Sequence, residues 1–108
     1  MNTTQITSLP VAFHPGETLS EKLQEMEMTE KECAEKANLP ECIVNAIVRE
    51  EISITADIAL ALEEATQIPA YMWLRMQNRY DEYILSQHKK TSYIEHLQRF
   101  TRTMAAML

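Results

Sequence analysis

Apolar residues recur every three or four positions over most of this chain, which is the spacing of amphipathic helices. Leu19, Leu23 and Met26 predict a first helix over residues 16–27. The sequence His-Pro-Gly-Glu at residues 14–17 precedes it, and there the proline suits a first turn while the glutamate complements the helix dipole. We therefore expect regular structure to begin at this point.

Two short helices follow, separated by about three residues. Thr29 and Glu32 have the spacing of a capping box, which opens a second helix that ends at residue 37. Asn38 is suited to a left-handed stop for that helix. The Leu-Pro-Glu sequence at residues 39–41 opens a third helix. Its inward positions are Val44, Ile47 and Val48.

A fourth and a fifth helix are predicted next. Thr55 is an N-cap for a helix that ends near residue 65, with Asp57 in its first turn. Pro69 starts the fifth helix, and its wide apolar face points to a position over the core. That face consists of Trp73, Met76, Tyr80 and either Tyr83 or Ile84.

The C-terminal residues predict one more helix. Residues 88–91 have the sequence His-Lys-Lys-Thr and are interpreted as a polar linker. Ser92 and Glu95 then form a second capping box, which opens a helix to residue 107. One face of this helix either folds back over the preceding helices or serves as a dimer or partner interface, where Met and aromatic residues are enriched. The residues of this face are Tyr93, Leu97, Phe100, Met104 and Met107.

The composition narrows the fold class further. The chain has 108 residues and one glycine, which leaves little turn chemistry for a β-sandwich and excludes glycine-rich phosphate loops. No stretch approaches the ~20 apolar residues that cross a bilayer, and residues 1–13 lack the basic start of a secretory signal. We expect an all-α, cytoplasmic protein without a membrane segment.

Charge is unevenly distributed along the chain. Residues 14–66 hold four basic side chains against thirteen acidic ones, a balance of −9. Residues 67–108 hold six basic side chains against three acidic ones, a balance of +3. Neutralisation of phosphates by Lys and Arg supplies most sequence-independent affinity for DNA. An acidic domain of this kind needs a local basic patch if it is to bind nucleic acid.

The capping threonine, short helix, tight turn and second short helix match the helix-turn-helix plan. More narrowly, the chain resembles the HigA-type antitoxins, or antidote proteins, of the lambda-repressor-like helix-turn-helix class. The resemblance rests on residues 14–17, 29–37, 54–63 and 72–81, and the last of these contains Trp-Leu-x-x-Gln-x-x-Tyr-Asp. It implies a five-helix domain over residues 14–87, preceded by an arm (1–13) and followed by a C-terminal helical extension (88–108).

The resemblance also implies a function. Members of this family are homodimers that bind a palindromic DNA operator through the third helix and repress their own operon. They neutralise a basic, ribosome-associated toxin that cleaves messenger RNA. The resemblance therefore predicts double-stranded DNA and a basic toxin protein as partners, with no cofactor.

The third helix departs from the family pattern. The family usually offers small hydroxyl, amide and basic residues there, but this chain has Pro40, Glu41, Cys42, Ile43, Asn45 and Ala46. An Asn-Gly turn usually follows this helix, whereas this chain has Arg-Glu-Glu at residues 49–51. Glutamate accepts from cytosine, asparagine reads adenine, and cysteine, isoleucine or alanine offers apolar contact to a thymine methyl.

Six residues form the predicted DNA-binding site. Arg49, Lys31 and Thr29 are expected to hold phosphates, whereas Asn45, Glu41 and Cys42 are expected to face bases. Two alternatives keep the same fold. In the first, the helix-turn-helix scaffold has lost DNA binding and acts as a protein-interaction module. In the second, the protein is a solitary repressor with no toxin partner.

The sequence gives little indication of a metal site, a disulfide or an enzymatic activity. His14, His88 and His96 pair with no cysteine at metal-ligand spacing, so no metal site is predicted, and His14 is assigned to the first helix entry. Cys33 is expected on a buried helix face and Cys42 on an exposed one, which argues against a disulfide. The many glutamates have the spacing of solvated helix faces, and we expect no enzymatic activity.

Overall fold

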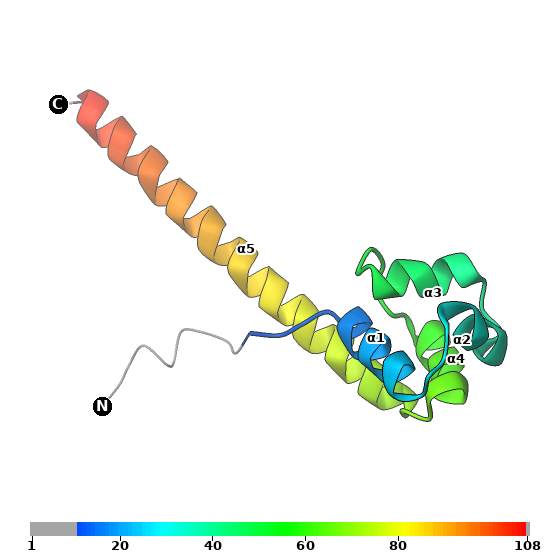
Figure 1. Ribbon diagram of the computed structural model, residues 1–108. Coiled ribbons are helices and arrows are strands. Elements are labelled where there is room, and N and C mark those ends of the chain that lie inside the picture. The colour runs from blue at the N-terminus through cyan, green and yellow to red at the C-terminus, as the bar shows by residue number, and fades with distance from the viewer. Residues whose placement is uncertain (1–10, 108) are drawn as a thin grey trace. The chain divides into compact units, whose positions relative to one another are not determined.

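The computed structural model describes the backbone of residues 11–107 and the side chains of residues 11–89. This part of the chain contains helices and no strand, so the predicted all-α class is confirmed (Figure 1). The first ten residues of the predicted arm (1–13) lie outside the described residues. The helices are α1 (Pro15–Glu25), α2 (Glu30–Ala37), α3 (Glu41–Val48), α4 (Ala56–Thr66) and α5 (Ala70–Met107).

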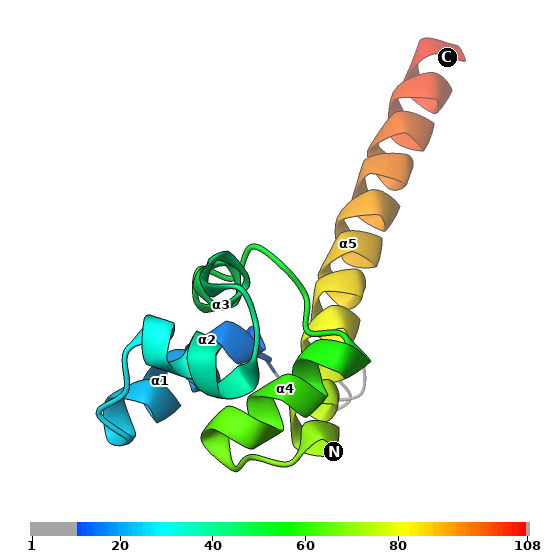
Figure 2. The same cartoon turned by 90° about the vertical axis from the view of Figure 1, so that its right-hand side faces the viewer.

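Residues Ala12–Tyr80 form one compact unit. In it α2 packs against both α3 and α4, and α1 packs against α3 (Figure 2). Trp73, the only tryptophan, is fully buried, which confirms its predicted place in the core. The predicted apolar stripes supply the rest of the core, including Leu19, Leu23, Val44, Ile47 and Leu62.

Side-chain caps set the helix boundaries where the sequence predicts them. The Thr29 hydroxyl accepts from the Glu32 N–H at 3.0 Å, and the Glu32 carboxylate accepts from the Thr29 N–H at 3.3 Å, so the capping box is present. Thr55 caps α4 through the Ile58 N–H. Asn38 ends α2 with φ 57°, the predicted left-handed stop. These caps fix the two short helices and the three-residue connection between them.

His14 joins three parts of the compact unit. Its Nδ1 accepts a 2.9 Å hydrogen bond from the Gly16 N–H and so caps α1. Because Nδ1 is an acceptor, Nε2 carries the proton and donates to the Ile52 carbonyl at 2.9 Å. The ring also packs edge-on against Tyr80, with the ring centroids 5.1 Å apart. The predicted assignment of His14 to the α1 entry is confirmed, and the bond to Ile52 adds a link to the chain after α3.

Gln77 holds the same connection from α5. Its Oε1 accepts a 2.8 Å hydrogen bond from the Ile54 N–H, and the side chain is 5% exposed. The segment between α3 and α4 is thus fixed at Ile52 by His14 and at Ile54 by Gln77. The sequence pattern did not identify this role of Gln77, because an isolated glutamine carries no periodic signal.

The single glycine permits a close approach between two helices. A Cβ built on Gly16 would collide with the carbonyl oxygen of Ile47, in the last turn of α3. Gly16 therefore lets the first turn of α1 lie directly against the backbone of α3. Its role is close packing, because no glycine in the described residues has a positive φ.

The predicted linker at residues 88–91 is wrong. One helix, α5, continues from Ala70 to Met107, so no separate helix begins at Ser92. Residues 88–91 contain no Gly or Pro, and their two lysines are good helix formers, so nothing in this segment ends a helix. A serine and glutamate at capping-box spacing cap a helix only when the preceding chain is not helical. The boundaries predicted at residues 13 and 87 stay predictions.

Replacing His14 with alanine is expected to lower the free energy of unfolding by about 2–3 kcal/mol. The change removes an N-cap and leaves the Ile52 carbonyl without its donor. Urea unfolding followed by the fluorescence of the buried Trp73 measures the effect. His88→Ala is the matched control, because His88 is exposed, and it should change stability by less than about 0.5 kcal/mol. Equal stability of both variants would contradict the role given to His14.

Candidate nucleic-acid interface

Helices α2 and α3 form the helix-turn-helix element of the compact unit (Figure 2). Val44 and Ile47 face the core and are fully buried. On the opposite side of α3, four residues have the spacing i, i+3, i+4 and i+7, which places them on one helix face. This reading face consists of Cys42, Asn45, Ala46 and Arg49.

The structure places the predicted base-facing residues on α3, with different exposures. Glu41 and Cys42 are exposed in the first turn of α3, and Asn45 is half-exposed in its middle. None of these three side chains has a hydrogen-bond partner among the described residues. Ile43 is different, because it is partly buried and packs against the core. Less of its side chain is therefore available for the expected contact to a thymine methyl, which stays a prediction.

The residues predicted to contact phosphates differ in how available their side chains are. Arg49, the C-cap of α3, and Lys31, in the first turn of α2, are both exposed. Thr29 is also exposed, but its hydroxyl accepts from the Glu32 N–H and donates to the Glu32 carboxylate at 3.1 Å. Thr29 would have to give up this second bond to donate to a phosphate. Of the six residues predicted to bind DNA, Arg49 and Lys31 are the two cations, and both are exposed.

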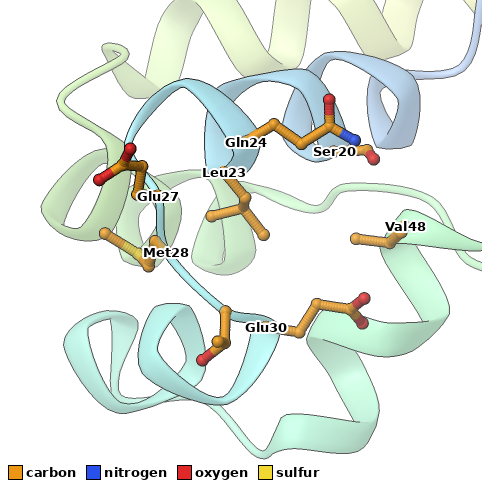
Figure 3. A pocket seen from close by; sticks show the side chains of 8 residues that line it. Ser20, Leu23, Gln24, Glu27, Met28, Glu30 and Val48 are labelled. Atoms are coloured by element: carbon orange, nitrogen blue, oxygen red, sulfur yellow. The ribbon is translucent and has the colours of Figure 1, made fainter.

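A concavity of about 430 Å³ lies beside this element (Figure 3). Leu23, Met28 and Val48 provide apolar walls, while Glu27 and Glu30 add carboxylates. In Figure 3 the Glu30 side chain extends toward the end of α3 that carries Val48. The carboxylates make this concavity unsuitable for a phosphate group.

The backbone after α3 adopts an uncommon conformation. Glu50 has φ 63°, in the left-handed region, and its N–H donates to the Ile47 carbonyl at 2.9 Å. Asparagine or glycine is the ordinary choice at such a helix end. The same conformation occurs at Glu27, Asn38 and Gln67, each just after a helix. A chain with one glycine therefore ends its helices with residues that carry a Cβ, at a cost in stability.

The two cysteines have the predicted exposures. Cys33 is buried in α2, and Cys42 is exposed on α3. Burial, with a smaller contribution from the charge of Glu30, raises the pKa of the Cys33 thiol. Cys33 is therefore an unreactive core residue, while Cys42 belongs to the reading face.

Other sites are absent from the part of the chain that the structure describes. In this part no group of three or more His, Cys, Asp or Glu side chains is placed to hold a metal ion. No helix in it is long and apolar enough to cross a membrane. The face of α5 with Tyr93, Leu97, Phe100, Met104 and Met107 lies beyond the described side chains, so its interface role stays a prediction.

The fold and the exposed α3 face define a helix-turn-helix protein. No model of a known protein family matches the chain. It is 38% identical over 81 residues to virulence-associated protein I of Dichelobacter nodosus, covering 74% of this chain and 75% of that protein. Two solved structures are also similar.

The first of these structures is an addiction module antidote protein of the HigA family from Coxiella burnetii. It is 33% identical, with a TM-score of 0.69, and the alignment covers 81% of this chain and 95% of that one. The second is the antitoxin HigA of Pseudomonas aeruginosa with the higBA promoter. It is 31% identical, with a TM-score of 0.68, and the alignment covers 80% of this chain and 94% of that one. The chain therefore belongs to the HigA family of antitoxins.

Replacing Glu50 with glycine is expected to raise the free energy of unfolding by about 1 kcal/mol, because glycine adopts a positive φ without strain. The matched control is Glu51→Gly, which removes the same charge at a position without positive φ and should not stabilise. Thermal and urea unfolding of both variants measure the difference. Equal stabilisation by the two changes would show that charge, and not the backbone conformation, is responsible.

Proposed function

We propose that this protein is a DNA-binding antitoxin that represses its own operon and neutralises a basic RNase toxin. The observation that carries the proposal is the reading face of α3, whose polar side chains are exposed or half-exposed and have no partner among the described residues. In helix-turn-helix proteins this helix enters the major groove. The Pseudomonas aeruginosa antitoxin HigA solved with its promoter, 31% identical to this chain, supports the same use of the fold.

The phosphate contacts of the proposed complex are few. Arg49 and Lys31 are the two exposed cations that we expect to make them, so a dimer would bring four, near the exposed carboxylates of Glu41, Glu50 and Glu51. Each neutralised phosphate contributes about 0.9 to the slope of log affinity against log salt. We expect a slope of about −4, which is shallow for a repressor. Affinity then depends more on base contacts than on charge.

The acidic surface supports the toxin partner. Residues 14–66 carry a balance of −9, and their glutamates are largely exposed. Complementary potentials steer two proteins together and favour a basic partner over an acidic one. The acidic residues that flank α3 favour the alternative function, which is a protein-interaction module without DNA binding. The two functions differ in whether α3 binds the upstream DNA of the gene.

Arg49→Ala is expected to weaken binding to every DNA sequence and to reduce the salt slope by about 2 per dimer. Fluorescence anisotropy with the upstream DNA of the gene and a scrambled duplex, at several salt concentrations, measures both quantities. The control is Lys22→Ala, which removes a cation paired with Glu25 at 3.4 Å and should leave binding unchanged. Equal weak binding of wild-type protein to both duplexes at low salt would favour the interaction module.

We also propose that the protein acts as a homodimer and that the C-terminal part of α5 contributes to it. The five residues of the predicted interface have steps of four, three, four and three along a continuous helix. This is the narrow a/d pattern of a two-stranded coiled coil, and a helix that packs on a globular core usually has a wider apolar stripe. The pattern favours pairing with the same segment of a second copy.

Leu97→Asp is expected to shift the protein toward the monomer, because it places a charge within this apolar pattern. Sedimentation velocity over a range of protein concentrations measures the equilibrium. The matched control is Gln98→Asp, which adds the same charge at an adjacent position outside the pattern. An unchanged dimer fraction in Leu97→Asp would exclude the C-terminal part of α5 from the interface.

A further inference from the structure

We propose that the reading face of α3 selects A·T base pairs, with Asn45 reading adenine and with Cys42 and Ala46 contacting thymine methyl groups. The inference rests on the proposed DNA-binding function and names the class of sequence that α3 recognises. It follows from the hydrogen-bond donors, acceptors and apolar side chains that this face presents, and from the absence of a basic side chain within α3.

Within α3 itself, this face lacks the side chains that read guanine. Bidentate contact to guanine O6 and N7 requires Arg or Lys, and it is the commonest specific contact in the major groove. The eight residues of α3 are Glu-Cys-Ile-Val-Asn-Ala-Ile-Val and contain neither. The first cation, Arg49, lies at the C-cap, where the chain leaves the helix. No basic side chain is therefore placed along the length of α3.

Asn45 is the one residue of α3 that combines a donor and an acceptor. The residue is partly exposed and its carboxamide has no hydrogen-bond partner among the described residues, so both groups are available to a ligand. An asparagine carboxamide pairs with adenine by accepting from N6 and donating to N7. The same pairing fails with guanine, because guanine presents acceptors at both positions.

Two of the neighbours of Asn45 on this face are apolar, and the third is Arg49 at the C-cap. Cys42 lies one turn before it and is exposed, and Ala46 follows it and is half-exposed. Only thymine offers a methyl group in the major groove, so small apolar side chains there favour T. Ile43 does not add to this surface, because it packs against the core. Thymines are therefore expected next to the adenine that Asn45 reads.

Glu41, at the start of α3, favours cytosine at one end of the half-site. It is exposed in the first turn of α3, and its carboxylate only accepts hydrogen bonds. The base group that suits it is the cytosine N4 amino group, and this contact leaves the paired guanine untouched. The proposed half-site thus contains adjacent A·T pairs with a cytosine at one end, and no guanine contributes a contact.

Selection of binding sites from a random duplex library with the full-length protein tests the proposal. The expected motif has adjacent A·T pairs in each half-site, with roughly 5- to 150-fold discrimination at the adenine. Asn45→Ala should abolish that discrimination while the salt slope stays unchanged. The control is Lys36→Ala on α2, which removes an exposed cation outside the reading face and should leave the motif intact.

Modified bases in the selected duplex separate the contacts. Deoxyuridine in place of thymidine removes the methyl group, and it should weaken binding of the wild-type protein but have a smaller effect on Cys42→Ser. Replacing guanine with 7-deazaguanine removes the N7 acceptor and should have no effect. A motif centred on guanine, or loss of binding with 7-deazaguanine, would overturn the inference while leaving DNA binding intact. A library that yields no motif at low salt would overturn the proposed DNA-binding function as well.

Discussion

The two hydrogen bonds of the His14 ring are the interaction on which the position of α3 depends. One nitrogen caps α1 by accepting from the Gly16 N–H, and the other donates to the Ile52 carbonyl, just after α3. A single imidazole therefore links the start of the domain to the segment that leaves the helix-turn-helix element. Gln77 holds the same segment from α5, and the absence of a Cβ at Gly16 lets α1 lie against the end of α3. Rigid support of this kind is what a recognition helix requires.

The chemistry of α3 and the charge of the domain lead to one conclusion about recognition. Lys31 and Arg49 are the two exposed cations that we propose contact the DNA backbone, while residues 14–66 carry a charge balance of −9. Non-specific affinity comes almost entirely from phosphate contacts, so we expect it to be low. Contacts to base edges then make up an unusually large share of the binding energy. We therefore expect the proposed repressor to discriminate well between sequences with a modest total affinity.

Sequence alone predicted most of the domain, because local rules decide most of its helix boundaries. The capping box at Thr29 and the left-handed stop at Asn38 depend on residues within one helical turn, and both are confirmed. The features that the sequence did not predict depend on contacts between distant residues or on a strained backbone conformation. The bond from Gln77 to Ile54 spans 23 residues, and Glu50 adopts a conformation that its residue type disfavours. The predicted linker at 88–91 failed because polar residues without a helix breaker remain helical.

The candidate site was only partly predictable for the same reason. Helical spacing placed Asn45 and Cys42 on an accessible face, but it did not show that Ile43 packs against the core. The most direct test of the account is backbone and side-chain amide NMR of the full chain titrated with its upstream DNA. We predict that the largest shift changes lie over residues 41–50 and include the side-chain amide of Asn45. Saturable binding that shifts other surfaces and leaves α3 unchanged would contradict the account.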